Sequence, residues 1–294
     1  MISTVHFMST YGSPRPFVKW AGGKSQAYPQ FRRRGLIPHK YNNYFEPFLG
    51  GGAIFLQLRP EAAILSDNNE ELINGYQVIK SNIRDLVKIL KKYKAKHSKE
   101  FYYKIRGQDV KTLDRVERAG RMIYLNKTCF NGLYRVNSKG QFNVPMGQYK
   151  NPNILGEKNL LKMHSLLNKP TIKIMVADFE DIEDACGKND FIYLDPPYHP
   201  LSKTANFTAY TKKTFGEEEQ KRLAAFFRRL SEKGCKVLLS NSGTEFIRNL
   251  YKKFYIHENI MVPRYINSDA TKRKPISEIA ITNYPAEKQG FKTA

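Results

Sequence analysis

Four consecutive residues after an apolar run could act together in catalysis: Asp195, Pro196, Pro197 and Tyr198. The run before them, residues 190–194, is short and apolar, which is typical of a buried strand. In open α/β sheets, ligands bind at the carboxyl ends of the strands, where these residues would lie. Prolines also end strands, so a plain turn from strand to loop is the alternative. An acid and an aromatic ring on either side of two prolines favour a catalytic site.

The chemistry that this group suits is activation of an exocyclic amine on a nucleic-acid base, for example N6 of adenine. Such an amine is a poor nucleophile because its lone pair is delocalised into the ring. The carboxylate of Asp195 and the carbonyl of Pro196 can each accept one amine hydrogen, which draws the nitrogen toward tetrahedral geometry. Prolines fix φ and so hold that carbonyl rigidly. The ring of Tyr198 can stack on a base that has been flipped out of a duplex.

A glycine-rich turn suits the binding of a nucleoside. The segment 46–52 reads Glu-Pro-Phe-Leu-Gly-Gly-Gly and precedes a helix-compatible run at 53–58. Glycines such as Gly50 and Gly52 let the backbone approach a ligand closely. The dinucleotide-binding fingerprint G-x-G-x-x-G would need a third glycine where Phe55 stands, which weakens that reading.

An acid follows the next predicted strand, at 62–66. Asp67 is placed to hydrogen-bond a ribose diol, as acids do after the second strand of nucleoside-binding units. Because Asp67, Asn68 and Asn69 precede a helical run, a helix N-cap is the alternative role for Asp67.

Residues 17–25 read Phe-Val-Lys-Trp-Ala-Gly-Gly-Lys-Ser and imitate the end of a phosphate-binding P-loop. That motif needs a glycine where Val18 stands, so a nucleoside triphosphatase is excluded. Trp20 is the only tryptophan of the chain, and it lies beside two glycines and Lys24. The segment therefore suggests a lid over a cofactor.

The charge of the chain favours a polyanionic partner. Lys and Arg number 49 against 27 Asp and Glu, so the formal net charge is +22, and 18 Tyr and 18 Phe are available for stacking. Cations release counterions from phosphates and aromatic rings stack on exposed bases, so nucleic acid fits both features. An excess of lysine that serves solubility alone is the alternative.

Other classes of protein are disfavoured. The sequence has no run of about 18 apolar residues that could span a membrane, and residues 1–16, an expected flexible tail, lack the apolar core of a signal peptide. Cys129, Cys186 and Cys235 show no C-x-x-C spacing, so we expect no metal site and no disulfide framework, and a reducing cytoplasm as the location. None of the three follows a proline, which excludes the Pro-Cys nucleophile of cytosine carbon-5 methylation.

Two stretches alternate strand and helix patterns around a different middle. The first is the strand, turn, helix and strand of 44–67, and the second runs from 170 to 286. The second contains predicted strands at 173–176, 190–194 and 236–239, an amphipathic helix at 217–230, and a closing strand pair at 255–262 and 276–284. Alternating βα units predict an α/β fold with a largely parallel sheet covered on both faces. The middle, 83–169, is too long for a loop and is expected to read the substrate.

In order and spacing, the motifs of this chain resemble the Dam-type (D12 class) family of adenine-N6 DNA methyltransferases from Phe17 to Tyr284. The motifs are Lys19-Trp20-Ala21-Gly22-Gly23-Lys24, Phe45-Glu46-Pro47-Phe48 with its glycines, Asp67, Cys129-Phe130-Asn131-Gly132-Leu133-Tyr134-Arg135-Val136-Asn137, Phe142-Asn143-Val144-Pro145, Asp178-Phe179, Asp195-Pro196-Pro197-Tyr198 and Ile276-Ser277-Glu278. Phe130 is a departure, because some members carry Tyr there and this chain lacks its hydroxyl.

The resemblance implies a Rossmann-like catalytic domain at 17–82 and 170–286, an inserted and mainly helical DNA-recognition domain at 83–169, and a C-terminal tail at 287–294. It implies S-adenosylmethionine as the cofactor, with no metal. The implied cofactor-binding residues are Trp20, Lys24, Phe48, Gly50, Gly52, Asp67, Asp178, Phe179 and Asp195. The implied DNA-binding residues are Phe130, Asn131, Leu133, Arg135, Asn137 and Pro145. Members with this reader segment act on GATC, so GATC is the expected site.

Several alternatives stay open. Arg135 can read guanine with two hydrogen bonds or can contact a phosphate, and residues 272–274 (Lys-Arg-Lys) can grip phosphates or form a solvated loop. An RNA or cytosine-N4 methyltransferase is one rival, against which Asp195 argues because cytosine-N4 enzymes usually carry Ser there. A DNA-binding regulator with an inactive fold is the other. The expected partner is double-stranded DNA, bound by a monomer, and a cognate restriction endonuclease is a further candidate.

Overall fold

The computed structural model describes residues 12–20, 22–201, 215–262 and 276–287. Its centre is a seven-stranded sheet in the order β3-β2-β1-β4-β5-β7-β6. The strands are β1 (Tyr44–Glu46), β2 (Ala63–Asp67), β3 (Ile172–Val176), β4 (Phe191–Leu194), β5 (Lys236–Asn241), β6 (Tyr255–Val262) and β7 (Ile276–Thr282). The predicted strands are confirmed within a few residues, and the predicted closing pair is β6 and β7. The first strand of the predicted stretch 44–67 ends at Glu46, because Pro47 cannot continue the ladder.

Strands β1 to β5 run parallel, and β7 is antiparallel to both β5 and β6. The chain winds outward from β1 to β2 and β3, and then crosses back to β4 and β5. The strand order therefore reverses between β1 and β4. In doubly wound sheets, the crevice at such a point, at the carboxyl ends of the strands, binds the ligand.

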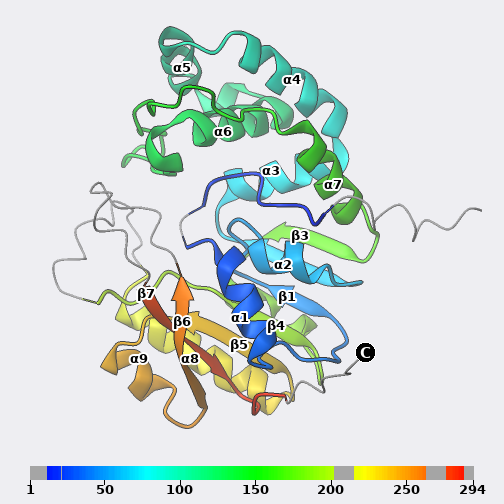
Figure 1. Ribbon diagram of the computed structural model, residues 1–294, viewed down its shortest axis with the longest axis vertical. Helices are drawn as coiled ribbons and strands as arrows, with labels where there is room; N and C mark the ends of the chain where they lie inside the picture. The colour runs from blue at the N-terminus through cyan, green and yellow to red at the C-terminus, as the bar shows by residue number, and fades with distance from the viewer. Residues whose placement is uncertain (1–11, 21, 202–214, 263–275, 288–294) are drawn as a thin grey trace, which may run out of the picture.

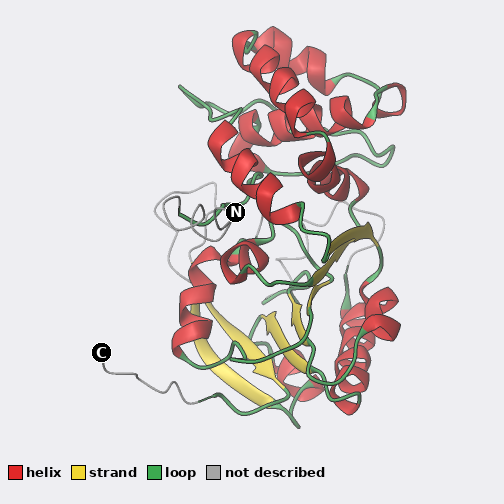
Figure 2. Cartoon of the chain, turned by 90° about the vertical axis from the view of Figure 1, so that its right-hand side faces the viewer, coloured by secondary structure: helices red, strands yellow, loops and turns green. Residues whose placement is uncertain are grey.

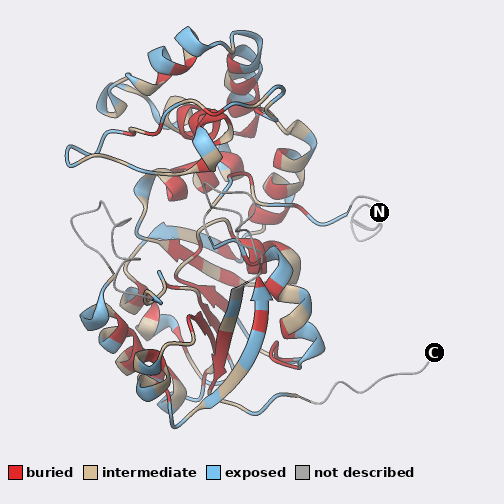
Figure 3. Ribbon diagram, turned by 60° about the vertical axis from the view of Figure 1, so that its left-hand side comes forward, coloured by how far each residue is buried: buried red, intermediate tan, exposed pale blue. Residues whose placement is uncertain are grey.

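Helices cover both faces of the sheet (Figures 1 and 2). The side chains of β4 alternate: Phe191 and Tyr193 belong to one hydrophobic cluster, and Ile192 and Leu194 to the other. Figure 3 shows the buried residues gathered in the central strands and in the helix faces against them. The first cluster includes side chains of α1 (Ala27–Arg33), α2 (Ala53–Leu58) and α3 (Glu70–Ser81), and the second includes those of η5 (Phe179–Ala185), α8 (Glu217–Glu232) and α9 (Glu245–Leu250). The α/β sheet covered on both faces is thus confirmed, as is the helix predicted at 217–230.

The chain between α3 and β3 forms a mainly helical layer at one end of the molecule (Figure 1). Its longest helix, α6, begins with a capping box in which Asp114 and Glu117 each bond the other's backbone. The hydrophobic cluster runs on from α3 into this layer without a break. The layer contains α4 (Ile83–Ala95), α5 (Lys99–Arg106), η3 (Val110–Thr112), α6 (Arg115–Thr128), η4 (Phe130–Gly132) and α7 (Glu157–Leu167). The predicted boundaries at 83 and 169, and a separate recognition domain, stay predictions.

Parts of the sequence-based account lie outside the described residues. These are the proposed phosphate contacts at 272–274 and most of the two tails. Within the described ranges, no helix is both long enough and apolar enough to cross a membrane.

Candidate active site

Three acids lie at the carboxyl ends of neighbouring parallel strands. Glu46 ends β1, Asp67 ends β2 and Asp195 follows β4. Burial raises the pKa of Glu46, as do the charges of Asp195 and Asp67, and with the hydrogen bond from Tyr44 opposing them the pKa is about 8. The three carboxyl groups follow adjacent parallel strands, at the edge of the sheet where the strand order reverses.

A buried lysine ties the first predicted motif together. Lys24 begins the short helix η2 (Lys24–Gln26), and its Nζ lies 3.1 Å from Oδ1 of Asp195. The same Nζ lies 3.7 Å from Oε2 of Glu278 and 4.7 Å from the ring centroid of Tyr198. The hydroxyl of Tyr198 donates to Oε2 of Glu278 at 2.8 Å. The structure therefore brings Lys24 from one end of the chain and Glu278 from the other onto the motif at 195–198.

One side-chain oxygen of Asp195 is placed to accept a further hydrogen bond. Its Oδ1 is buried and, apart from the ion pair with Lys24, has no hydrogen-bond partner among the described residues. Burial raises the pKa of Asp195, and the adjacent Lys24 opposes that rise. A carboxylate oxygen has two lone pairs, so Oδ1 can accept a further hydrogen bond from a ligand donor beside its ion pair with Lys24.

Two buried amides hold the proline loop. Gln220 on α8 donates from Nε2 to the carbonyl of Pro197 at 2.8 Å. Its Oε1 accepts from Nδ2 of Asn241, the last residue of β5, at 3.0 Å. Both side chains are fully buried, whereas the carbonyl of Pro196 accepts no bond from the described part of the chain. The loop is thus fixed through Pro197, and the carbonyl of Pro196 remains available.

The glycine turn packs against the predicted lid. Gly50 and Gly52 both have positive φ, +47° and +65°. A Cβ at Gly50 would lie 2.9 Å from the ring of Trp20, and one at Gly52 would lie 2.7 Å from the hydroxyl of Tyr76. Only glycine fits this conformation and this spacing. Trp20 also packs against Tyr134 of the helical layer, with ring centroids 5.5 Å apart, so it touches both the turn and the layer.

Asp67 binds the glycine turn rather than capping the next helix. Its Oδ2 accepts from the backbone N–H of Gly50 at 2.9 Å, and its Oδ1 accepts from that of Asn69 at 2.9 Å. The N-cap of α3 is Asn69, whose side chain accepts from Leu72. The alternative of an Asp67 N-cap is therefore wrong.

An aromatic pair lies near the carboxyl end of β3. Phe48 stacks on Phe179, with centroids 5.4 Å apart and planes at 26°. Asp178 begins η5: its Oδ1 accepts from Glu180, and its Oδ2 pairs with Arg222 at 2.8 Å. Both oxygens of Asp178 already have partners, so its predicted contact with a cofactor would have to share or displace them.

The predicted DNA-reading residues lie together on one exposed loop after α6. Phe130 is 45 % exposed, and Asn131 has φ +53°. The Nε of Arg135 donates to Asn143 at 2.7 Å, while neither terminal nitrogen of Arg135 pairs with a residue in the described ranges. Pro145 is exposed, and its carbonyl accepts from the N–H of Phe130 at 2.9 Å. This bond holds both ends of the loop together.

Asn137 and Leu133 make more contacts within the protein than the other predicted DNA-reading residues. The side-chain oxygen of Asn137 accepts from the backbones of Lys139 and Gln141, and its Nδ2 donates to the side chain of Gln141 at 3.0 Å. Asn137 therefore builds the turn between the paired residues Val136 and Phe142, and a DNA contact by its side chain stays a prediction. Leu133 is half-buried against the core of the layer.

A fully buried amide joins the exposed loop of predicted DNA-reading residues, the reading loop, to the N-terminal segment. Asn126 on α6 accepts from the N–H of Lys19 at 2.7 Å and donates to the carbonyls of Lys19 and Gly132 at 2.8 and 2.9 Å. A Cβ at Gly132 would collide with Lys19, at 2.5 Å. Because Lys19 precedes Trp20, this joint connects the loop to the segment predicted to form a cofactor lid.

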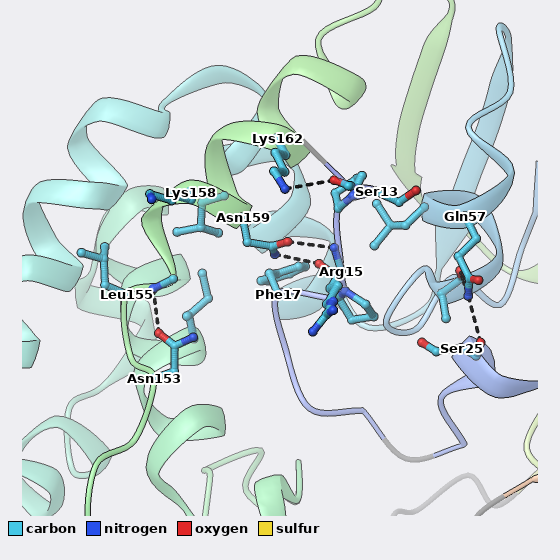
Figure 4. Close-up of a pocket in the computed structure, with 18 of the residues that line it drawn as sticks. Ser13, Arg15, Phe17, Ser25, Gln57, Asn153, Leu155, Lys158, Asn159 and Lys162 are labelled. Atoms are coloured by element: carbon cyan, nitrogen blue, oxygen red, sulfur yellow. Dashed lines mark hydrogen bonds between the residues drawn. The ribbon is translucent and has the colours of Figure 1, made fainter. Parts of the chain in front are cut away.

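The N-terminal segment makes a second joint beside α7. Asn159 exchanges two hydrogen bonds of 2.8 Å with the backbone of Arg15, and Gln57 of α2 donates to the carbonyl of Ser25 (Figure 4). The bonds border a cavity of about 890 Å³ between the helical layer and α2. The segment 12–26 thus bridges the layer and the sheet.

Sequence reasoning missed Glu278, Gln220, Asn241 and Asn126 as residues that support the site. Glu278 ends one of the family motifs, but the sequence predicts no role for it, and the three amides give no signal beyond polarity inside apolar patterns.

The three cysteines are buried thiols, and burial raises the pKa of Cys129 and Cys235 to about 11. Within the described residues, no group of His, Cys, Asp or Glu is arranged to hold a metal ion.

Comparisons with known proteins identify the class. The sequence model of the family "D12 class N6 adenine-specific DNA methyltransferase" matches residues 20–265. The chain is 45 % identical to the type II methyltransferase M1.LlaDCHI of Lactococcus lactis subsp. cremoris, covering 92 % of this chain and 95 % of that protein. It is 42 % identical to the type II methyltransferase M.MjaIII of Methanocaldococcus jannaschii (92 % and 99 %) and 35 % identical to the DNA adenine methylase of Escherichia coli K12 (90 % and 94 %).

The chain therefore belongs to the D12 class of N6 adenine-specific DNA methyltransferases. The family resemblance inferred from the sequence motifs is confirmed.

The buried acid Glu46 predicts an unusual dependence of stability on pH. Its pKa is about 8 in the folded protein against a usual value of 4.5, so the folded state holds a proton that the unfolded state releases between these values. Its contribution to the free energy of unfolding is greatest below pH 4.5 and is lost as pH rises to 8, by about 1.4 kcal/mol per pH unit. Glu46→Gln should remove this slope in urea unfolding curves recorded between pH 5.5 and 8.

Glu61→Gln is the matched control, because the Glu61 side chain is 92 % exposed. It should leave the slope unchanged. Equal slopes in wild type and Glu46→Gln would show that Glu46 is ionised in the folded protein at neutral pH.

Proposed function

We propose that the protein transfers the methyl group of S-adenosylmethionine to N6 of the adenine in GATC within double-stranded DNA. We further propose that it works as a cytoplasmic monomer of a type II restriction-modification system, with a cognate endonuclease as partner. The observation that carries the proposal is the buried Oδ1 of Asp195, which pairs with Lys24 and can accept one more bond, followed in the chain by a Pro196 carbonyl that accepts none from the described residues. Both lie at the point where the strand order of the sheet reverses.

The residues at this end of the sheet suit S-adenosylmethionine. The two left-handed glycines keep the turn free of side chains beside Trp20, so its backbone can approach a ligand closely. Asp67 fixes that turn and offers a carboxylate to a ribose diol, and Phe48, stacked on the buried Phe179, offers an apolar ring to an adenine. When bound, the cofactor supplies an electrophilic methyl group on a sulfonium sulfur.

The motif at 195–198 prepares the nucleophile. A flipped adenine would stack on the ring of Tyr198 and place its amine between two acceptors, Oδ1 of Asp195 and the carbonyl of Pro196. Accepting both hydrogens would localise the lone pair on N6. The carboxylate of Asp195 is placed to receive the proton that N6 must lose on methylation. Lys24 opposes the rise in pKa that burial imposes on that carboxyl group.

The reading loop supplies the sequence preference. The terminal nitrogens of Arg135, which pair with no described residue, form a fork that matches O6 and N7 of guanine. The exposed ring of Phe130 and the exposed Pro145 offer apolar contacts beside it. The restriction-modification role rests on the relatives named type II methyltransferase.

One assay tests this function against its rivals. Purified protein and S-adenosylmethionine with a labelled methyl group are incubated with duplexes that contain GATC, duplexes that lack it, and RNA of the same sequence. The labelled nucleoside is then identified after digestion. We expect N6-methyladenine in the GATC duplex alone. Label on cytosine or only on RNA would establish one of the rivals, and no transfer to any substrate would favour an inactive regulator.

A further inference from the structure

Glu278 reaches the motif at 195–198 from the antiparallel edge of the sheet. It lies on β7 opposite Ile260 of β6, next to an irregularity of that ladder between His257 and Ile260 where Asn259 has φ +57°. β-bulges recur beside active sites, where they redirect a side chain. The side chain of Glu278 is only 12 % exposed, and it points at Tyr198 and Lys24 rather than at solvent.

The stronger of its two contacts is with Tyr198. The hydroxyl of Tyr198 donates to Oε2 of Glu278 at 2.8 Å, whereas Lys24 Nζ is 3.7 Å from the same oxygen and closer, 3.1 Å, to Asp195. Burial raises the pKa of Tyr198 well above its usual range, so its hydroxyl stays protonated and remains a donor. The hydroxyl end of the Tyr198 ring is thus held by a hydrogen bond to a carboxylate on strand β7.

We propose that Glu278 is a positioning residue for methyl transfer, because its bond to the Tyr198 hydroxyl holds the ring in the plane on which the flipped adenine stacks. This inference rests on the proposed role of Tyr198 as the stacking platform. Lys24 loses little if Glu278 is absent, because it still pairs with Asp195 and donates to the carbonyl of Gly22 at 2.7 Å. Glu278 therefore acts mainly through the ring.

Two substitutions at 278 separate this role from a purely structural one. Glu278→Gln keeps a side-chain oxygen that can accept from Tyr198, whereas Glu278→Ala removes the acceptor. Tyr198→Phe removes the donor and leaves the ring. Without this hydrogen bond, the fraction of complexes in which the ring stacks on the flipped adenine should fall about tenfold, as expected for the loss of one hydrogen bond to a charged group. Glu278→Ala and Tyr198→Phe should therefore have similar effects, and Glu278→Gln a much smaller one.

The experiment uses two measurements on the full chain. The first is the single-turnover rate of methyl transfer to unmethylated plasmid DNA, which depends on no assumption about the site. The second is the fluorescence increase of 2-aminopurine in place of the target adenine, which reports base flipping. We expect a roughly tenfold loss in both for Glu278→Ala and for Tyr198→Phe. The double variant should lose no more than Tyr198→Phe alone, because both changes remove the same bond.

Glu258→Gln is the matched control, since Glu258 lies on the neighbouring strand β6 and its side chain pairs, among the described residues, with Arg248 alone. It should match wild type in both measurements. Wild-type rates in Glu278→Ala, or a double variant that loses the product of the two single effects, would overturn the inference. Failure of the GATC proposal would appear instead as wild-type plasmid methylation outside GATC, and the rates on plasmid DNA would still decide the role of Glu278.

Discussion

Replacing Asp195 by asparagine is expected to lower kcat for methyl transfer by about a thousandfold, the scale on which preorganised electrostatic groups contribute. The substitution removes the charge that localises the lone pair of the amine, and it puts an amide N–H donor into a place that needs acceptors. The fold should survive, because Lys24 keeps Glu278 and the carbonyl of Gly22 as partners. Single-turnover kinetics with saturating S-adenosylmethionine and DNA measure the effect on the chemical step alone.

The control is Asp85→Asn, since the side chain of Asp85 is 58 % exposed and its one partner in the described part of the chain is Lys88, one helical turn away. It should turn over like wild type. Circular dichroism and DNA affinity should be unchanged in both variants. A kcat for Asp195→Asn within tenfold of wild type would remove Asp195 from the chemistry. Because burial raises the pKa of Asp195, the wild-type rate should also fall with decreasing pH earlier than an exposed aspartate would dictate.

Replacing Arg135 by alanine is expected to collapse discrimination at a guanine. A bidentate contact between arginine and guanine contributes roughly 1–3 kcal/mol of discrimination, or about 5- to 150-fold. The kcat/KM for GATC should fall by about that factor, while kcat/KM for duplexes altered at the guanine should change little. The measurement is kcat/KM for wild type and Arg135→Ala on GATC and on each of its single-base variants.

Asn143→Ala supplies the comparison, because Asn143 accepts from Nε of Arg135 and so orients the fork without reading a base itself. We expect an intermediate loss with the same preferred sequence. If Arg135 contacts a phosphate instead, Arg135→Ala will weaken binding to all duplexes equally and reduce the salt dependence by about one charge. That pattern would contradict the reading role.

The sheet could be predicted from sequence because its signals are local. Each predicted parallel strand is a short apolar run that ends at an acid or an amide, and α8 shows its helical period through Leu223, Phe226, Phe227 and Leu230, all buried in the structure. The expected grouping of Asp67 and Asp195 follows from the same logic, since parallel strands bring their carboxyl ends to one edge.

The supports of the site could not be predicted because they depend on strand order. Glu278 meets Tyr198 only because β7 turns antiparallel between β5 and β6, an order that no local pattern specifies. The contact of Gln220 with Pro197 likewise requires α8 to lie across the end of β4. Asn137 shows a further limit: the motif did not indicate that its side chain holds a turn, as it does in the structure, and its DNA contact stays a prediction.

A crystal structure of the complex with a GATC duplex and an unreactive analogue of S-adenosylmethionine tests the central claim most directly. We predict a target adenine outside the helix, stacked on Tyr198, with N6 at roughly 3 Å from both Oδ1 of Asp195 and the carbonyl of Pro196. The analogue should lie against Gly50 and Gly52 with its sulfur-equivalent atom facing N6. An adenine that stays paired in the duplex, or an amine out of reach of Asp195, would contradict the account.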